Sequence, residues 1–225
     1  MKEYHQFYIN GSWVDPINGL NKLDVLNPAT EESIGSIALG SSEDVNAAVE
    51  AAKNAFANFS SSEKEERVGY LEKIIEIYGK RSSEMAEAIS SEMGAPMSLA
   101  SKAHSPSGLG HFMTALETLK NYDFEQQKDG LFIRKEAIGV VGMITPWNWP
   151  INQIACKVAP AIAAGCTMIL KPSEIAPFNA MLMAEIIHEA GIPDGVFNLV
   201  NGDGPTVGEA MSSHPDIDMM SFTGS

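Results

Sequence analysis

The chain is poor in cysteine and contains no long apolar run. Cys156 and Cys166 are its two cysteines, and their spacing matches neither a redox pair nor a zinc ribbon, so we expect no disulfide framework and no metal site. No apolar stretch approaches the ~20 residues of a membrane span, and the first residues lack the apolar core of a signal peptide. These absences predict a cytoplasmic protein that does not enter a membrane.

Basic residues are also scarce, because 15 Lys and Arg face 29 Asp and Glu, for a formal net charge of -14. Such a chain repels a nucleic-acid backbone, and no local basic cluster offsets the repulsion, so we expect no nucleic-acid partner. A dinucleotide stays compatible with this charge, since backbone N–H groups and one lysine can hold its phosphates. The 225 residues, 44% of them hydrophobic, suffice for a sizeable core.

The N-terminal region has the pattern of antiparallel strands. Residues 7–14 alternate around Asn10-Gly11, a pair that favours the left-handed angles of a tight hairpin turn. Residues 23–26 and 34–39 flank the turn sequence N-P-A-T. We therefore expect these segments to extend the hairpin into a small antiparallel layer on the surface.

Helical periodicity begins after residue 41 and continues through the next eighty residues. A capping box of Ser62 and Glu65 predicts the start of a second helix, which ends before Gly94. The stretch 97–122 contains Pro106 and two glycines near it, so we expect it to break into two shorter helices.

Residues 124–138 interrupt the helical pattern around Asp129-Gly130 and predict a hairpin that protrudes. After Gly139 short apolar strands alternate with helices. Strands are expected at 140–144, 167–170, 196–200 and 219–222, and helices at 151–164, 177–190 and 205–212. Right-handed crossovers make this pattern a Rossmann-like α/β fold, a parallel sheet with helices on both faces that binds ligands at the carboxyl ends of its strands.

Sequence motifs follow each of these strands. I-T-P-W-N-W-P (144–150), K-P-S-E (171–174) and S-F-T-G-S (221–225) end the first, second and fourth strands, and N-G-D-G-P-T-V-G (201–208) follows the third. A side-chain amide and a lysine therefore meet at one edge of the sheet. Gly202 and Gly204 permit close backbone approach, although the spacing G-x-G-x-x-x-G departs from the dinucleotide fingerprint.

Together with G-I-P-D-G-V-F-N-L-V-N-G, these motifs resemble the aldehyde dehydrogenase superfamily in order and spacing, and the resemblance covers the whole chain. That family oxidises an aldehyde to an acid by cysteine attack, hydride transfer to NAD or NADP, and thioester hydrolysis assisted by a glutamate. The resemblance implies an NAD-binding domain formed by residues 1–123 and 139–225, and an oligomerisation hairpin at 124–138. It also implies that the catalytic domain, with the cysteine and the glutamate, lies beyond residue 225.

The resemblance assigns roles to individual residues. Asn148 corresponds to the catalytic amide that stabilises an oxyanion, and Trp149 to an aromatic that lines the substrate tunnel. Lys171 and Glu174 correspond to the pair that binds the adenosine ribose, and the carboxylate at 174 repels a 2′-phosphate, which favours NAD over NADP. The further cofactor-binding residues are Ile144, Thr145, Pro146, Trp147, Asn148, Ser173, Gly204, Gly208, Phe222, Gly224 and Ser225.

Neither cysteine matches the family's nucleophile, and we interpret both as packing residues. His104 and His111 have no third ligand at a suitable spacing and are expected on the surface or lining a cavity. Three hypotheses stay open: an inactive cofactor-binding part of an NAD-dependent aldehyde dehydrogenase, a non-catalytic nucleotide- or partner-binding module, and one half of a split enzyme completed by a C-terminal fragment. In the intact enzyme the substrate is an aldehyde and the assembly a homo-oligomer.

Overall fold

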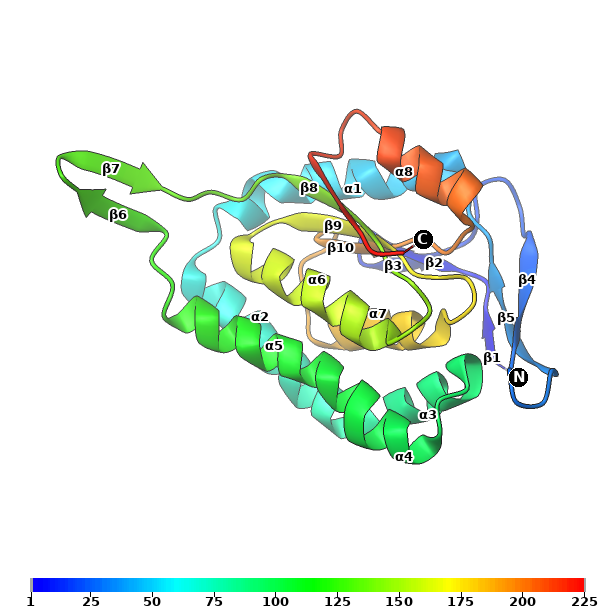
Figure 1. The fold of residues 1–225 in the computed structure, drawn as a ribbon. Helices are drawn as coiled ribbons and strands as arrows, with labels where there is room; N and C mark the ends of the chain where they lie inside the picture. The colour runs from blue at the N-terminus through cyan, green and yellow to red at the C-terminus, as the bar shows by residue number, and fades with distance from the viewer. Residues whose placement is uncertain (1, 225) are drawn as a thin grey trace.

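The computed structural model describes residues 2–224, and its largest sheet has the strand order β11-β8-β9-β10-β2-β3 (Figure 1). The parallel strands of this sheet are β8 (Val140–Ile144), β9 (Thr167–Lys171), β10 (Phe197–Leu199) and β11 (Met219–Phe222). Helices lie between consecutive parallel strands, as a right-handed crossover requires. The predicted Rossmann-like α/β fold is confirmed.

Successive side chains of these strands enter two separate cores. Met168 and Leu170 pack in one cluster, whereas Ile169 between them packs in the other. Strand side chains alternate between the faces of a sheet, so a sheet covered on both faces needs apolar residues at every position. Burial on both faces explains why the sequence of β9 begins with T-M-I-L and does not alternate between apolar and charged residues.

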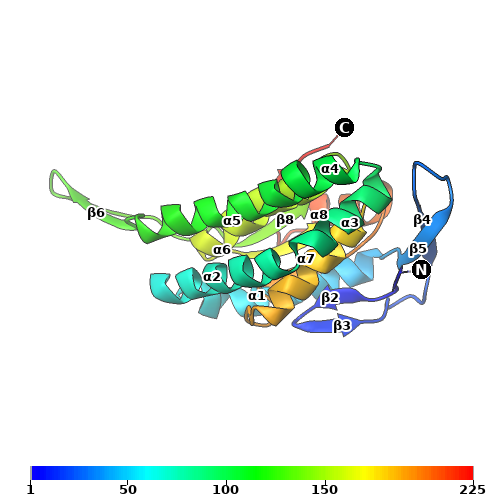
Figure 2. The ribbon, with the colours of Figure 1, turned by 90° about the horizontal axis from the view of Figure 1, so that it is seen from below.

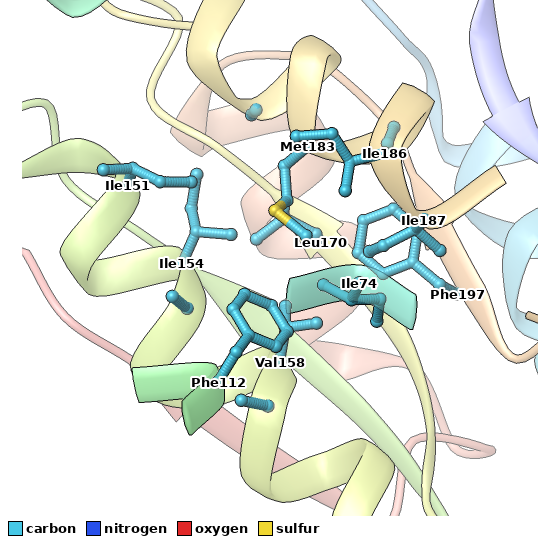
Figure 3. Close-up of a cluster of buried hydrophobic side chains, with 14 of the residues drawn as sticks. Ile74, Phe112, Ile151, Ile154, Val158, Leu170, Met183, Ile186, Ile187 and Phe197 are labelled. Carbon is cyan, nitrogen blue, oxygen red and sulfur yellow. The ribbon is translucent and has the colours of Figure 1, made fainter. Parts of the chain in front are cut away.

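Two layers of helices cover one face of the sheet and a single layer covers the other (Figures 1 and 2). The single layer consists of α1 (Ser42–Ser60) and α8 (Glu209–Ser213). On the opposite face, the inner layer consists of α6 (Pro150–Ala164) and α7 (Phe178–Glu189). The outer layer on that face includes α2 (Lys64–Lys80), α3 (Ser82–Met93) and α5 (Ser105–Lys120). Figure 3 shows the larger core, in which Ile154 of α6, Ile186 of α7 and Phe112 of α5 surround Leu170.

The N-terminal hairpin is confirmed, but its predicted surroundings are wrong. Asn10 and Gly11 have φ of 51° and 74° between β2 (Phe7–Ile9) and β3 (Ser12–Val14). Strand β2 pairs antiparallel with β10 and so extends the main sheet. The three residues of β2 are all buried, because a strand that is apolar at every position suits the interior of a sheet better than a surface layer.

Residues 23–26 and 34–39 belong to a different sheet. β4 (Lys22–Leu26) pairs antiparallel with β5 (Ser33–Ala38), and β1 (Lys2–Tyr4) pairs parallel with β5 on the other side. This small sheet lies beside the main one (Figure 1). The pairing of these two segments was correctly predicted, and their attachment to the first hairpin was not.

The second helix begins one residue later than predicted. The capping box that starts α2 joins Glu63 and Glu66, not Ser62 and Glu65. Ser62 instead donates its hydroxyl to the carbonyl of Phe59, so it closes α1 rather than opening α2. The helical run then breaks at Arg81, where α3 begins.

The stretch after Gly94 contains one long helix instead of two shorter ones. A single turn, α4 (Met97–Leu99), and a π-helical segment, η1 (Ala100–His104), lead without a gap into α5. Pro106 lies in the first turn of α5, directly after the π-helical segment. Because proline has no N–H, it interrupts the helical hydrogen-bond ladder at this junction. The irregularity therefore falls at His104, as expected, but His111 lies inside an unbroken helix.

The predicted hairpin protrudes from the domain as β6 (Glu125–Lys128) and β7 (Leu131–Arg134) (Figure 1). Asp129 and Gly130 occupy the left-handed region at its tip, with φ of 50° and 79°. All residues of both strands are exposed, including Leu131 and Phe132. Within residues 2–224 no helix is long and apolar enough to cross a membrane.

Candidate cofactor-binding cleft

The carboxyl ends of β8, β9 and β11 border a cleft of about 790 Å³. The strand register explains why their motifs meet there. Ile144 pairs with Lys171 on one side and with Phe222 on the other. The ladder continues beyond the strands, because the N–H of Thr145 donates to the carbonyl of Lys171 and that of Thr223 to the carbonyl of Ile144.

Every cofactor-binding residue predicted between positions 2 and 224 lines this cleft. They are Ile144, Thr145, Pro146, Trp147, Asn148, Lys171, Ser173, Glu174, Gly204, Gly208, Phe222 and Gly224. Ser225 lies outside the described residues. Four lining residues were not among the predicted ones: Ile175, Glu209, Ser212 and Thr223. Thr223 lies within the motif S-F-T-G-S, and Ile175 and Glu209 directly follow K-P-S-E and N-G-D-G-P-T-V-G, so motifs widened by one position contain these three.

Lys171 is the buried cation of the cleft. It ends β9, is 3% exposed, and donates through Nζ to the carbonyl of Pro172 at 3.1 Å and to Oε2 of Glu174 at 3.2 Å. An ammonium group has three donors, so one of them stays available for a ligand. The carboxylate of Glu174 lies beside it and is one-third exposed, which places a donor and an acceptor next to each other at the cleft wall.

Asn148 presents its side-chain amide at the other wall of the cleft. The residue is exposed, and among residues 2–224 its side chain takes part in no hydrogen bond within the protein. The position before α6 that a capping side chain would take belongs to Trp149, which makes no capping bond. Asn148 therefore does not serve the helix, and its amide is free to contact a ligand.

Trp149 is held next to Asn148 in a strained conformation. Its φ and ψ are both 50°, a left-handed geometry that a bulky residue rarely adopts and that clusters at functional sites. The indole stacks on the ring of His104, with centroids 4.0 Å apart and planes 12° from parallel. Trp149 does not itself line the cleft, although it directly follows Asn148, which does.

His104 differs from the expected surface or lining position, because it is 1% exposed. Burial lowers the pKa of its imidazole, so the ring is neutral near pH 7. The π-helical segment that ends at His104 directs the ring into the core, and π-helical turns often occur at functional sites. His111 lies on α5 and makes a 2.9 Å hydrogen bond to the amide oxygen of Asn152.

The glycines after β10 serve different purposes. A Cβ at Gly202 would lie 2.2 Å from a methyl of Val207, whereas a Cβ at Gly204 would meet nothing within 4 Å. The absent side chain of Gly202 thus allows packing within the protein and not the approach of a ligand, contrary to the prediction. Gly204 and Gly208 lie in the π-helical segment η2 (Gly204–Gly208), which Asp203 caps by accepting the N–H of Thr206.

The surroundings of the two cysteines agree with a packing role. Cys166 is buried, and Cys156 donates its thiol to the carbonyl of Gln153 at 3.3 Å. Burial raises the pKa of the Cys156 thiol, which keeps it protonated, whereas a nucleophile needs a thiolate. No group of three or more metal-ligating side chains occurs within the part of the chain that the structure describes.

An open α/β sheet with a cleft at the carboxyl ends of its strands defines a class of protein that binds its ligand at that edge. The model of the aldehyde dehydrogenase family matches residues 13–225. The chain belongs to the aldehyde dehydrogenase family.

Relatives of known name agree with this assignment. A 3-succinoylsemialdehyde-pyridine dehydrogenase from a Pseudomonas species is 53% identical, and the match covers 100% of this chain but 47% of the relative. The crystal structure of an aldehyde dehydrogenase from Bartonella henselae superposes with a TM-score of 0.97 at 51% identity, over 100% of this chain and 48% of that protein.

A mutant of aldehyde dehydrogenase C from Pseudomonas syringae, solved with NAD+ and octanal, has a TM-score of 0.94 at 50% identity, over 96% of this chain and 44% of that protein. The chain thus spans about half the length of the relatives that it matches. Across that half the fold is the same, and the family is known for oxidoreductases that act on aldehydes.

Proposed function

We propose that this chain is the NAD-binding part of an NAD-dependent aldehyde dehydrogenase, which oxidises an aldehyde to a carboxylic acid. One observation carries the proposal: Lys171, Glu174 and Asn148, on loops that follow two neighbouring strands, line a single cleft. The buried cation offers a donor and the carboxylate an acceptor for the two hydroxyls of a ribose. The free amide offers a donor for an oxyanion.

The residues of the cleft suit a dinucleotide. Lys171 has an unused donor and Glu174 an exposed acceptor for the two hydroxyls of the adenosine ribose. Gly204, Gly208, Phe222 and Gly224 also line the cleft; the two glycines would lie beside the adenine, and Phe222 and Gly224 beside the pyrophosphate. Residues 144–147 border the nicotinamide half. NAD, when bound, supplies the hydride acceptor.

The cofactor we propose is NAD rather than NADP. Glu174 and Glu209 both line the cleft, and the carboxylate beside Lys171 lies where a 2′-phosphate on the adenosine ribose would have to fit. A carboxylate and a phosphate that lie close together repel each other, and repulsion of the competing ligand is a common source of specificity. NADP affinity well below NAD affinity is the expected outcome, and equal affinities would sink this part of the proposal.

Asn148 is the group that we assign to the chemistry. An amide that is aimed in advance at a developing oxyanion stabilises it by about 3–4 kcal/mol in enzymes where such donors have been removed. The amide of Asn148 is exposed and unpaired within residues 2–224, and the stacked, strained Trp149 restricts its backbone. In the intact enzyme it is the donor for the tetrahedral intermediate of the aldehyde.

The hairpin of β6 and β7 is proposed to join subunits of a homo-oligomer. It projects away from the domain (Figure 1), and Leu131 and Phe132 near its tip are 66% and 65% exposed. An exposed two-stranded hairpin with apolar side chains gains stability when a partner covers it.

Calorimetry with NAD and NADP, together with an aldehyde oxidation assay, tests the proposal. The chain should bind NAD and should not oxidise aldehydes by itself, because Cys156 and Cys166 are assigned to packing. Absence of NAD binding contradicts the cofactor role. Turnover that Cys156→Ser or Cys166→Ser abolishes would overturn the assignment of the cysteines.

A further inference from the structure

Glu92 is a buried acid of α3 that binds the first turn of a different helix, α7. It lies near the end of α3, is 1% exposed, and accepts hydrogen bonds from the backbone N–H groups of Phe178 and Asn179 at the start of α7. It also accepts one from Nδ2 of Asn179 at 2.8 Å. All three contacts bring a donor to an oxygen of Glu92, which accepts in each of them.

The helix α7 depends on this remote carboxylate because it has no cap of its own. Its N-cap residue is Pro177, which makes no capping hydrogen bond. The orphan N–H groups of a first helical turn are normally satisfied by a Ser, Thr, Asp or Asn at the cap position. Here an acid from α3 takes that place, so the position of the first turn of α7 is tied to α3.

Asn179 carries the connection from Glu92 into the loop that precedes α7. Its Nδ2 donates both to Glu92 and to the carbonyl of Ala176, at 2.7 Å. Because both neighbours are acceptors, the orientation of this amide is unambiguous. Ala176 in turn donates its N–H to the carbonyl of Ser173, and the hydroxyl of Ser173 accepts the N–H of Ile175.

This chain of contacts ends at the cleft. The turn from Ser173 to Ala176 contains Glu174, whose carboxylate binds Nζ of Lys171 at 3.2 Å. We propose that Glu92 is a positioning residue of the cofactor site: through Asn179 it anchors the turn that presents Glu174 and Lys171 to the adenosine ribose. This inference rests on the proposed function for its ligand, but the anchoring itself is a property of the protein alone.

Two variants separate anchoring from ordinary helix capping. Glu92→Gln keeps the size of the side chain but replaces an acceptor with an amide donor that faces the N–H groups of α7. Asn179→Ala leaves the two backbone bonds of Glu92 in place and removes both bonds of the side-chain amide, to Glu92 and to the carbonyl of Ala176. It keeps the acid at position 92 with its two backbone bonds, so it stays informative if Glu92→Gln does not fold.

Glu185→Gln is the matched control. Glu185 lies on the same helix α7, where it binds Arg81 and the hydroxyl of Tyr4, and it does not line the cleft. Its loss weakens the packing of α7 without touching the first turn of the helix.

The test combines hydrogen exchange with nucleotide binding at about pH 8, where the carboxylate form prevails. Both variants should speed hydrogen exchange at the N–H groups of Ile175 and Ala176 by about tenfold. They should also lower the affinity for NAD and the affinity for AMP by about tenfold each. NAD and AMP share the adenosine half, so an equal loss locates the defect there. Glu185→Gln should change neither quantity.

Faster exchange confined to Phe178 and Asn179, with AMP affinity unchanged, would show a helix cap without a positioning role and overturn the inference. If the unmodified chain binds neither NAD nor AMP, the proposed function fails, and the exchange at Ile175 and Ala176 alone decides whether Glu92 anchors the turn.

Discussion

Two loops at the same edge of the sheet are built on opposite plans. The loop after β9, residues 172–177, is held by polar contacts: Lys171 binds Glu174, Asn179 binds Ala176, and Glu92 binds the first turn of α7. The loop after β8, residues 145–149, has an exposed asparagine whose side chain makes no hydrogen bond among residues 2–224, and the stack of Trp149 on His104 holds the loop. Hydrogen bonds hold the first loop in place. A stacking contact between two rings holds the second loop, in which Trp149 keeps a strained backbone conformation.

Under the proposed function, the difference suits two separate tasks. A loop whose polar groups satisfy one another has a fixed shape, which suits the recognition of a constant ligand such as the adenosine half of NAD. A loop that leaves an amide unpaired retains a donor for charge that forms later in a reaction, where a group already satisfied by the protein would contribute nothing. The predictions below test this contrast from the largest expected effect to the smallest.

The free energy of unfolding should depend on pH through Glu92, the acid that binds the first turn of α7. Burial raises the pKa of Glu92 from 4.5 to about 7, against the hydrogen bonds from Asn179 and Phe178 and the charge of Lys2. A raised pKa means that the stability contributed is fully present below pH 4.5 and is lost as pH rises through about 7. Relative to Glu92→Gln, the free energy of unfolding should therefore be higher at about pH 5 than at about pH 8, by up to about 3 kcal/mol.

Urea unfolding of both proteins at the two pH values measures this difference. Glu185→Gln again serves as control, since Glu185 lies elsewhere on α7. A difference that grows with rising pH would contradict the burial of an acid at position 92.

Loss of the cation should remove most of the NAD affinity. In Lys171→Met the side chain keeps its length but loses the donor, and hydrogen bonds from charged groups contribute about 1.5–3 kcal/mol, which corresponds to roughly 10–100-fold in affinity. Lys73→Met removes a cation from the exposed face of α2, where it binds Glu76, and should leave affinity unchanged. Equal losses in the two variants would mean that NAD senses net charge rather than this lysine.

The second loop should respond to removal of its ring contact. His104→Ala deletes a buried ring stacked on Trp149, so we expect a loss of about 1–3 kcal/mol in the free energy of unfolding. The tryptophan fluorescence should also shift as the indole becomes mobile. In His111→Ala, which removes a histidine of α5 that bonds Asn152 and not Trp149, the emission should stay unchanged; the same shift in both variants would exclude the stack as its cause.

Removal of the free amide should have the smallest effect on this chain. Asn148→Ala deletes no hydrogen bond within residues 2–224, so the free energy of unfolding should change by less than about 0.5 kcal/mol. NAD affinity should change by less than about threefold, a fraction of a kcal/mol. Asn179→Ala is the opposite case, because Nδ2 of that amide donates to both Glu92 and Ala176. A large destabilisation in Asn148→Ala would show that this amide belongs to the framework of the loop.

The composition of the cleft was predictable because it depends on local patterns. Strands such as 140–144 and 167–171 are short apolar runs, and the carboxyl ends of parallel strands meet at one edge whatever the details of packing. Motifs that follow such strands must converge there, and twelve of the predicted residues do line the cleft.

The contacts that brace the cleft were not predictable, because they join distant parts of the chain. Glu92 and Phe178 lie 86 positions apart, and neither has a local pattern that points to the other. A partial indication exists: Met85, Ile89 and Glu92 share the helical spacing of a buried face, so an acid in that row must find donors. The pairing of β2 is a similar case. Its hairpin with β3 is local, but its other partner, β10, is nearly two hundred residues away in the sequence.

The central claim is that the cleft at the ends of β8, β9 and β11 holds NAD. The most direct test is the change of backbone amide NMR shifts when NAD is added to the 24.2 kDa chain. The account predicts shifts that cluster at residues 144–148, 171–175, 204–212 and 222–224. Shifts that cluster instead between α5 and α6, around His111 and Cys156, or no shifts at any NAD concentration, would contradict it.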